Sequence, residues 1–271
     1  MRLSVRHLTS YHYSHAITYA IQTLRLTPRP YDGLAVLRWQ VRGETTRPLP
    51  SFTDGFGNIV HSHSINRQHD SGAILVEGEV ETRPTDGVVR GAPEPLPPEF
   101  FLRTTKLTEA DPAIAELAIA GTRGATSRDR LQSLMAAIHA RLPYRQGVTD
   151  ARTTAAQALR NGSGVCQDHA HLFIAAARHL GTPARYVGGY LWTGADGGEY
   201  EASHAWAEAY AEDIGWIGFD PSNGTEPSEA YIRTAVGLDY WSAAPVRGIW
   251  RGEAEETLAV AVTVTQAQTE Q

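Results

Sequence analysis

Apolar and polar residues alternate along the first 82 positions of the chain. The alternation is strict over 37–42 and returns over 73–81, which places every second side chain on one face of a β-strand. Between these runs, segment 54–58 contains two glycines, an aspartate and an asparagine, residue types that tolerate the positive φ angles of hairpin turns. The first third of the chain is therefore predicted to be an antiparallel all-β unit.

A proline-rich stretch follows, and the hydrophobic period changes beyond it. Four of the eight residues 91–98 are prolines, which cannot extend a strand ladder and favour a stiff connection. Further on, Asp111 and Pro112 mark a helix start, and apolar residues recur at helical spacing over 131–142. Thr154 begins a capping-box pattern that predicts a third, short helix.

Strand patterns return in the last third of the chain. We predict strands near 185–193, 202–210, 215–220 and 257–265. Helices followed by strands within one unit indicate an α+β layer, here with helices packed on an antiparallel sheet. The predicted organisation is an N-terminal all-β domain (1–90), a proline-rich linker (91–105) and an α+β domain (106–271).

Composition excludes several classes of protein. The 271 residues are 42% hydrophobic and carry a net charge of −6, and Cys166 is the single cysteine, so neither an internal disulfide nor a thiolate metal cage can form. Acidic and basic residues are interleaved, which disfavours nucleic-acid or anionic-membrane partners. The start of the chain lacks a signal-peptide pattern, and we expect a cytoplasmic protein.

Cys166 follows a glycine-rich segment, 161–165, and precedes an apolar helical face that begins at Leu172. This order places the thiol at a helix N-terminus. Unpaired N–H groups and the helix dipole there favour a thiolate and could hold an oxyanion. The alternative is a buried structural cysteine that behaves as a small hydrophobe.

A thiolate nucleophile needs a base and a group that orients the base, and segment 202–221 offers both. His204 and Asp220 lie on two predicted strands around a turn. A hairpin centred on residue 212 would make them direct cross-strand partners on one face. A slip of one residue would instead place the two side chains on opposite faces.

Three segments together resemble a known family. Gly164-Val165-Cys166-Gln167-Asp168, Ala202-Ser203-His204-Ala205-Trp206 and Gly218-Phe219-Asp220-Pro221-Ser222-Asn223-Gly224 are similar to motifs of the bacterial transglutaminase-like cysteine enzymes, which have a papain-like fold. Segments 24–29 and 54–58 resemble the β domain that precedes the catalytic domain in that family. The resemblance implies that Cys166 is the nucleophile, that His204 is the base and then the acid, and that Asp220 orients His204.

Other side chains near the motifs are weaker candidates. Gln167 and Tyr144 are candidates for the cleft or for a second oxyanion donor, and Trp206 shares the strand face of His204. Glu208 lies further along that face and is expected at a solvated rim. Trp216 is a second tryptophan that could wall the cleft or belong to the core.

No metal or other cofactor is expected. His169 and His171 lie two positions apart on a predicted helix and therefore point in different directions. His61 and His63 share a strand face that His69 could join, and an exposed polar face is the preferred interpretation over a metal site.

The functional hypothesis is thiol-dependent acyl transfer or hydrolysis at a carboxamide or peptide bond of a protein or peptide, through an acyl-thioester. The enzyme would be a cysteine peptidase or amidase if water is the acceptor, and a transglutaminase if an amine is. The alternative is a non-catalytic module that keeps the fold, binds a peptide, and has an unreactive thiol.

Overall fold

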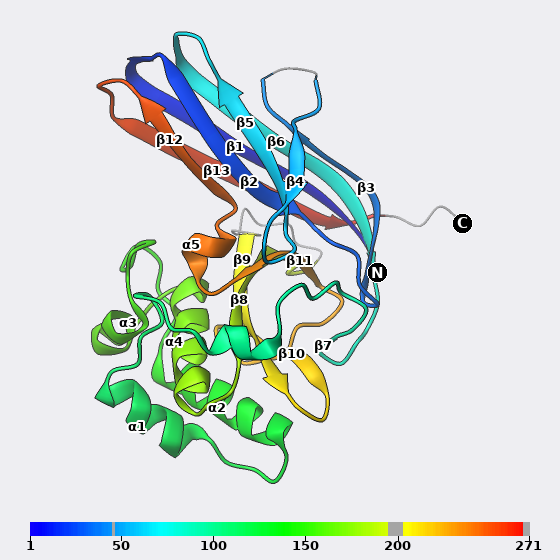
Figure 1. The fold of residues 1–271 in the computed structure, drawn as a ribbon, viewed down its shortest axis with the longest axis vertical. Helices are drawn as coiled ribbons and strands as arrows, with labels where there is room; N and C mark the ends of the chain where they lie inside the picture. Colours follow the sequence, from blue (N-terminus) through cyan, green and yellow to red (C-terminus); the bar gives the residue numbers. More distant parts are fainter. Residues whose placement is uncertain (45–46, 195–202, 268–271) are drawn as a thin grey trace.

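The alternating N-terminal segment forms two sheets in the computed structural model, which describes residues 1–44, 47–194 and 203–267. Its strands are β1 (Arg2–Ile17), β2 (Tyr19–Thr27), β3 (Leu34–Arg42), β4 (Ser51–Thr53), β5 (Ile59–Ile65) and β6 (His69–Thr82). The two sheets have the orders β13-β1-β6-β3 and β12-β2-β5-β4. They form the two layers of long strands in the upper half of Figure 1.

The end of the chain returns to these sheets. β12 (Val246–Arg251) pairs with β2, and β13 (Glu256–Gln266) pairs with β1 in antiparallel register. Residues 246–266, which we placed in the α+β domain, therefore complete the N-terminal sheets. The division of the chain into domains stays a prediction, but the hydrogen bonding of its last two strands is with the first two.

The third sheet and the helices make up the lower half of Figure 1. The sheet has the order β11-β8-β9-β10-β7, from β7 (Val88–Val89), β8 (Ala184–Leu191), β9 (Ser203–Ala211), β10 (Gly215–Phe219) and β11 (Tyr231–Gly237). The helices are η1 (Pro98–Leu102), α1 (Pro112–Gly121), α2 (Ser127–Arg141), α3 (Ala155–Asn161), α4 (Cys166–His179) and α5 (Tyr240–Ala243). This is the mixed α+β architecture that the sequence predicts. Ala202, at the start of the predicted strand 202–210, lies outside the described residues.

The predicted helix starts are confirmed by their capping bonds. Asp111 accepts a hydrogen bond from the backbone N–H of Ile114, and Thr154 forms a capping box with Gln157. These bonds satisfy N–H groups that have no partner within the helix. Within the described chain, none of the helices has the length and apolar character needed to cross a membrane.

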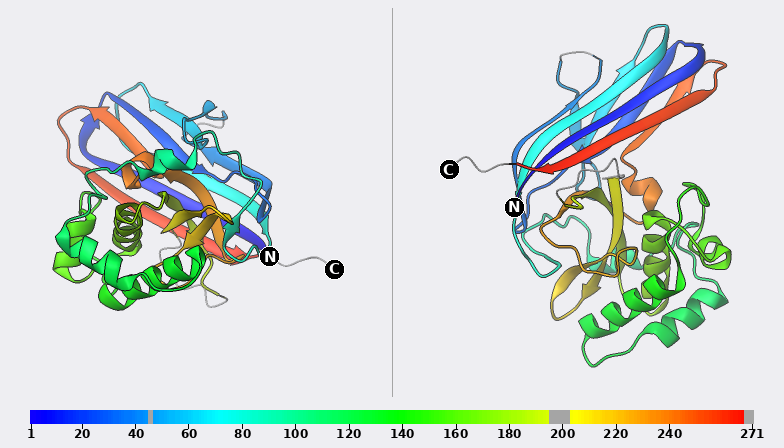
Figure 2. Two further views of the ribbon diagram at one scale, coloured as in Figure 1. Left: turned by 60° about the horizontal axis from the view of Figure 1, so that its bottom comes forward. Right: turned by 180° about the vertical axis from the view of Figure 1, so that it is seen from behind.

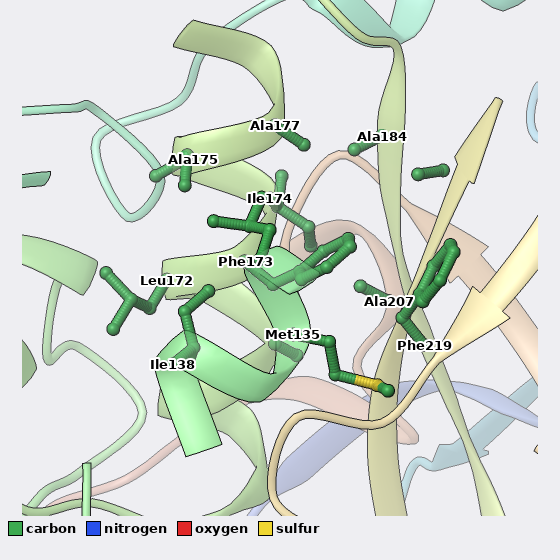
Figure 3. Packing of buried hydrophobic residues seen from close by; sticks show 14 of the residues in the cluster. Met135, Ile138, Leu172, Phe173, Ile174, Ala175, Ala177, Ala184, Ala207 and Phe219 are labelled. Atoms are coloured by element: carbon green, nitrogen blue, oxygen red, sulfur yellow. The ribbon is translucent and has the colours of Figure 1, made fainter. Parts of the chain in front are cut away.

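The central helix α4 is buried over almost its whole length, from Asp168 to Arg178. Phe173 of α4 stacks on Phe219 at a ring distance of 5.1 Å, and Figure 3 shows Met135 of α2 and Ala207 of β9 close to them. The alanines of β9 in this core are short, so the helix can approach the sheet closely.

The core of the two-layered β part extends to two residues of the third sheet. Tyr190 of β8 and Ile232 of β11 pack with residues of the N-terminal sheets such as Leu24. The right view of Figure 2 shows the third sheet next to these sheets. Asn58, in the predicted turn 54–58, donates to the carbonyl of Val236 and accepts from its N–H, both at 2.8 Å. The Asn58 side chain therefore fixes the turn to β11 by bonding to both backbone groups of Val236, as the backbone of a neighbouring strand would.

The expectation of an exposed histidine face on the N-terminal sheets was wrong. His63 and His69 are buried, at 7% exposure each. His63 contacts the side-chain oxygen of Gln22, and His69 contacts the carbonyl of Arg67. Strand alternation gives the shared face, but which face is covered depends on the second sheet.

Candidate active site

Cys166 is the first residue of α4, as the sequence predicts. The preceding loop is tight, since a Cβ atom on Gly164 would lie 2.7 Å from that of Asp168. The Asp168 carboxylate accepts the backbone N–H of Val165 at 2.8 Å and so closes the start of the helix. The backbone N–H groups of Cys166 and Gln167 have no carbonyl acceptor within the helix. They leave a positive helix end beside the half-buried thiol.

His204 contacts Asp220 with 2.6 Å between Nε2 and Oδ2. The register that brings them together differs from the predicted one by two residues. Phe219 pairs with Ala207, so the side chain of Asp220 reaches His204 diagonally rather than from directly opposite. The predicted pairing was therefore wrong, but a shift of two keeps both side chains on the same face because strand side chains alternate with period two.

Asp220 is fully buried and is the acceptor for a set of donors that the sequence analysis missed. Oδ1 accepts the N–H and the hydroxyl of Ser222 and the N–H of Asn223. Oδ2 accepts the Asn223 amide at 2.7 Å and the Tyr231 hydroxyl at 2.8 Å, besides contacting His204. Burial alone would raise the pKa of Asp220, but the bond with His204 and these donors outweigh it and hold that pKa well below its usual range. The carboxylate is thus charged and fixed.

Some of these hydrogen-bond donors to Asp220 could be predicted from the order of residues in the sequence. Ser222 and Asn223 directly follow Asp220, and an aspartate commonly accepts hydrogen bonds from the backbone two or three positions on. Tyr231 comes from the next strand, β11. Its contact depends on sheet order, for which the local sequence contains no signal.

The His204 ring is enclosed by aromatic side chains. Trp206 stacks on it at a ring distance of 6.2 Å, and Tyr231 meets it edge-on at 5.9 Å. Burial alone would lower the pKa of His204, but the bond to Asp220 and the adjacent Cys166 outweigh it and raise that pKa to about 10. The environment therefore favours an imidazolium between a carboxylate and the thiol.

Cys166 and His204 both line a cavity of about 180 Å³. Its lining comes from α4, β8, β9, β11 and α5, together with Leu26 of β2 and the residue before β12. The lining residues are Leu26, Val165, Cys166, Gln167, Tyr186, Gly188, Gly189, Tyr190, Ser203, His204, Ala205, Thr234, Tyr240, Ala243 and Pro245.

The weaker candidates take different places. Gln167 lines the cavity, and its side-chain amide lies 3.5 Å from the carbonyl of Asp150. Tyr144 lies instead beside His169, with the two rings stacked at 6.3 Å. Trp206 is buried against His204 and Tyr231 rather than at the cavity surface. The Trp206 ring stacks on the His204 imidazole and so helps to fix its orientation.

The histidines of α4 hold backbone segments in place. His169 contacts the carbonyls of Val165 and Leu142, and His171 accepts the backbone N–H of Tyr240. The two rings therefore reach different parts of the chain, as their spacing on the helix predicts.

Glu208 is not at a solvated rim, contrary to the sequence-based expectation. It is buried, with Oε1 accepting from Arg233 Nε at 2.7 Å and Oε2 from Arg185 Nε at 2.6 Å. Arg185 also pairs with both carboxylate oxygens of Glu94 and stacks over Trp216. Burial alone would raise the pKa of Glu208, but the two guanidinium groups hold it below its usual range. The network ties the proline-rich segment to β8, β9 and β11.

The fold and the site define a class: an α+β protein with a β-strand N-terminal part. In it, a cysteine at a helix start and a histidine of a strand line one cavity, and an aspartate that follows the neighbouring strand contacts the histidine. The model of the transglutaminase-like superfamily matches residues 115–221, and that of the bacterial transglutaminase-like N-terminal region matches residues 3–81. The chain belongs to the transglutaminase-like superfamily. The resemblance inferred from the three sequence motifs is thereby confirmed.

Relatives match over nearly the whole chain. An uncharacterized protein of Mycobacterium leprae (strain TN) is 31% identical over 277 residues, which cover 98% of this chain and 99% of the relative. An uncharacterized protein of Mycobacterium tuberculosis (strain ATCC 25618 / H37Rv) is 31% identical over 278 residues, covering 92% and 87%. The crystal structure of a proposed cysteine protease from Cytophaga hutchinsonii has a TM-score of 0.78 at 19% identity and covers 100% of this chain and 92% of that one. It is similar in fold.

Proposed function

We propose that this protein is a cysteine-dependent acyl-transfer enzyme acting on a carboxamide or peptide bond of a protein or peptide. The observation that carries the proposal is the 2.6 Å contact of His204 with Asp220 at a cavity that Cys166 also lines. Because Nε2 of His204 is bonded to the carboxylate, Nδ1 is the nitrogen left for the thiol. This is the arrangement of nucleophile, base and orienting group that covalent catalysis needs.

In the first half of the reaction, the Cys166 thiolate attacks the carbonyl carbon and forms a C–S bond, and the carbonyl electron pair moves onto oxygen. The N–H groups at the first turn of α4 stabilise this oxyanion. The oxyanion then collapses, the C–N bond breaks, and the His204 imidazolium protonates the departing amine. The products are a free amine and an acyl-thioester on Cys166.

In the second half, neutral His204 takes a proton from the acceptor, which is water or an amine. The acceptor attacks the thioester carbon, the C–S bond breaks, and the thiolate and imidazolium are restored. Water yields a carboxylic acid, so the enzyme is then a peptidase or amidase. An amine yields a new amide, and the enzyme is then a transglutaminase.

The competing hypothesis, a peptide-binding module with an unreactive thiol, predicts that iodoacetamide alkylates Cys166 no faster than free cysteine. The proposed enzyme predicts much faster alkylation at pH 6, because a thiolate paired with an imidazolium reacts there whereas free cysteine is almost entirely protonated. The buried charge of Asp220 and its six hydrogen-bond contacts support the enzyme, because a binding module has no need of a fixed carboxylate behind a histidine.

The proposal is tested by intact-mass spectrometry with acylating reporters. We expect N-acetyl-peptidyl p-nitrophenyl esters to add one acyl group to the protein with a burst of p-nitrophenol, and peptide mapping to place the group on Cys166. The Cys166→Ala variant is the matched control and should gain no mass. Equal acylation of the variant, or a wild-type thiol no more reactive at pH 6 than free cysteine, would reject the proposal.

The pKa of His204 predicts the alkaline limit of activity. The imidazolium is needed to protonate the leaving amine, and the pKa of about 10 keeps it charged well above neutrality. Because this pKa lies above the unfolded value of about 6.5, the ion pairing also stabilises the fold fully below pH 6.5. That contribution is lost as the pH rises through 10.

We therefore expect kcat/KM for an amide reporter to stay high into the alkaline range and to fall near pH 10. The measurement is a pH profile with a p-nitroanilide reporter, corrected for its uncatalysed hydrolysis. A p-nitrophenyl ester is the control, since its leaving group departs without a proton. A decline centred near pH 7 with the anilide would contradict the assignment of His204 as the acid.

A further inference from the structure

We propose that the cavity beside Cys166 binds an apolar side chain of the acyl-donor peptide, and that the N-terminal sheets set its size through Leu26. The inference rests on the proposed function, since it names the substrate class of the same site. Leu26 belongs to β2, whereas Cys166 and His204 belong to α4 and β9, yet all three line one cavity.

The chemistry of the lining favours an apolar occupant. Cys166 and His204 are the only lining residues with an ionisable thiol or imidazole, and the described lining contains no Asp, Glu, Lys or Arg. The Thr234 hydroxyl donates to the carbonyl of Gly188 at 2.9 Å, and the Tyr190 hydroxyl contacts Nδ1 of His7 at 2.9 Å. A charged side chain placed there would lose its hydration without gaining a partner of opposite charge.

The volume suits a side chain of medium size. An apolar protein cavity of about 150 Å³ holds a benzene molecule, and this one measures about 180 Å³. A leucine, methionine or phenylalanine side chain fits that space, whereas alanine leaves most of it unfilled.

Gly188 keeps the cavity open. A Cβ atom at Gly188 would meet only the carbonyl oxygen of Ala243, at an ordinary 3.7 Å, so the backbone has room for a side chain there. At the neighbouring Gly189 a Cβ atom would lie 2.1 Å from the carbonyl oxygen of Ile232, which forbids one. Gly189 is therefore required by packing, while the lack of a side chain at Gly188 leaves room in the cavity.

Leu26 forms the wall contributed by the N-terminal sheets. It is buried at 2% exposure and packs in the core that those sheets share with Tyr190. Shortening Leu26 would deepen the cavity, and adding a side chain at Gly188 would narrow it. The two changes therefore have opposite expected effects on substrate size.

The test uses N-acetyl-peptidyl p-nitroanilides in which the residue bearing the reacting carbonyl, or the one before it, is alanine, leucine, phenylalanine, glutamine, glutamate or lysine. We expect wild-type kcat/KM for leucine or phenylalanine at one of these positions to exceed that for alanine by about 10-fold or more. Glutamate and lysine should react more slowly than alanine. A preference for glutamine or for a charged side chain, or equal rates for all six, would overturn the proposal.

The variants sharpen the test. Gly188→Val should lower the ratio of kcat/KM for the large reporters to kcat/KM for the alanine reporter by about 10-fold or more. Leu26→Ala should shift preference toward phenylalanine. Gly55→Val is the matched control, since no atom lies within 4 Å of a Cβ at Gly55, and its profile should equal that of wild type. Gly188→Ala replaces Gly188→Val if the latter does not fold, with a smaller shift in the same direction.

Failure of this inference is distinguishable from failure of the proposed function. If Cys166 is acylated by the ester reporters but no side-chain preference follows the two cavity variants, the function stands and the cavity assignment is rejected. If no reporter acylates Cys166 in the wild type, the proposed function itself is rejected.

Discussion

Asp220→Asn is expected to lower kcat by about 10⁴-fold while the protein remains folded. The reason is the direction of the hydrogen bonds around the carboxylate. Oδ1 accepts two backbone N–H groups and the Ser222 hydroxyl, so the oxygen of the new amide must take that position. The amide nitrogen then replaces Oδ2 and faces His204.

This replacement changes the tautomer of His204. An amide N–H donates, so Nε2 of His204 must become the acceptor and its proton moves to Nδ1. Nδ1 is the nitrogen left for Cys166, and once protonated in a neutral ring it cannot accept the proton of the thiol. The ring also loses the carboxylate that stabilises its charged form. The Asn223 amide and the Tyr231 hydroxyl, which donate to Oδ2 in the wild type, must also reorient. The proton transfer from the thiol to His204 is blocked.

Steady-state kinetics with the anilide reporter measure this effect, and a thermal unfolding curve checks that the variant folds. Tyr231→Phe is the control, since it removes one donor to Oδ2 and leaves the carboxylate and its contact with His204 in place. Its loss of activity should be much smaller than that of Asp220→Asn. An Asp220→Asn enzyme within tenfold of wild type would show that Asp220 does not orient the base.

Glu208→Gln is expected to reduce the free energy of unfolding by about 3–5 kcal/mol. Glu208 is the acceptor for two buried guanidinium groups, and both of its oxygens are used. A glutamine in the same place removes one charge and turns an N–H toward Arg185 or Arg233. Both arginines then remain buried, and among the described residues Glu94 is the carboxylate left to pair with Arg185.

Urea unfolding measures the change, with Glu77→Gln as the matched control. Glu77 also lies on a strand and faces Arg6 and Arg42, but at 4.0 and 3.8 Å and in contact with solvent. Exposed pairs of this kind contribute about 0–1 kcal/mol. Equal losses in the two variants would mean that the buried network adds nothing specific to stability.

Local features of the fold were predictable from the sequence because their causes lie within a few residues. The capping residues Asp111 and Thr154 accept hydrogen bonds from backbone N–H groups three positions away. Cys166 lies at the start of α4 because a glycine-rich loop precedes a helical apolar face. Each of these features involves neighbours along the chain, so a pattern in the sequence suffices to predict it.

The contact of His204 with Asp220 shows where such prediction ends. A hairpin centred on residue 212 predicted both side chains on one face, whereas a slip of one residue would have placed them on opposite faces. The actual register differs by two residues, because the turn after Ala211 and the pairing with β8 decide it. A period of two cannot distinguish registers that differ by two.

By itself, the sequence predicted the succession of β-rich, helical and again β-rich segments and the position of Cys166 at a helix start. For a hairpin centred on residue 212 it also predicted a shared face for His204 and Asp220. Only the tertiary structure decided that Glu208 is buried, that β12 and β13 pair with β2 and β1, and that Leu26 reaches the cavity of Cys166. The physical reason is the separation along the chain of the residues that decide each feature. Periodicity reports the local geometry of a strand or helix, whereas burial and sheet order depend on which distant segments cover it.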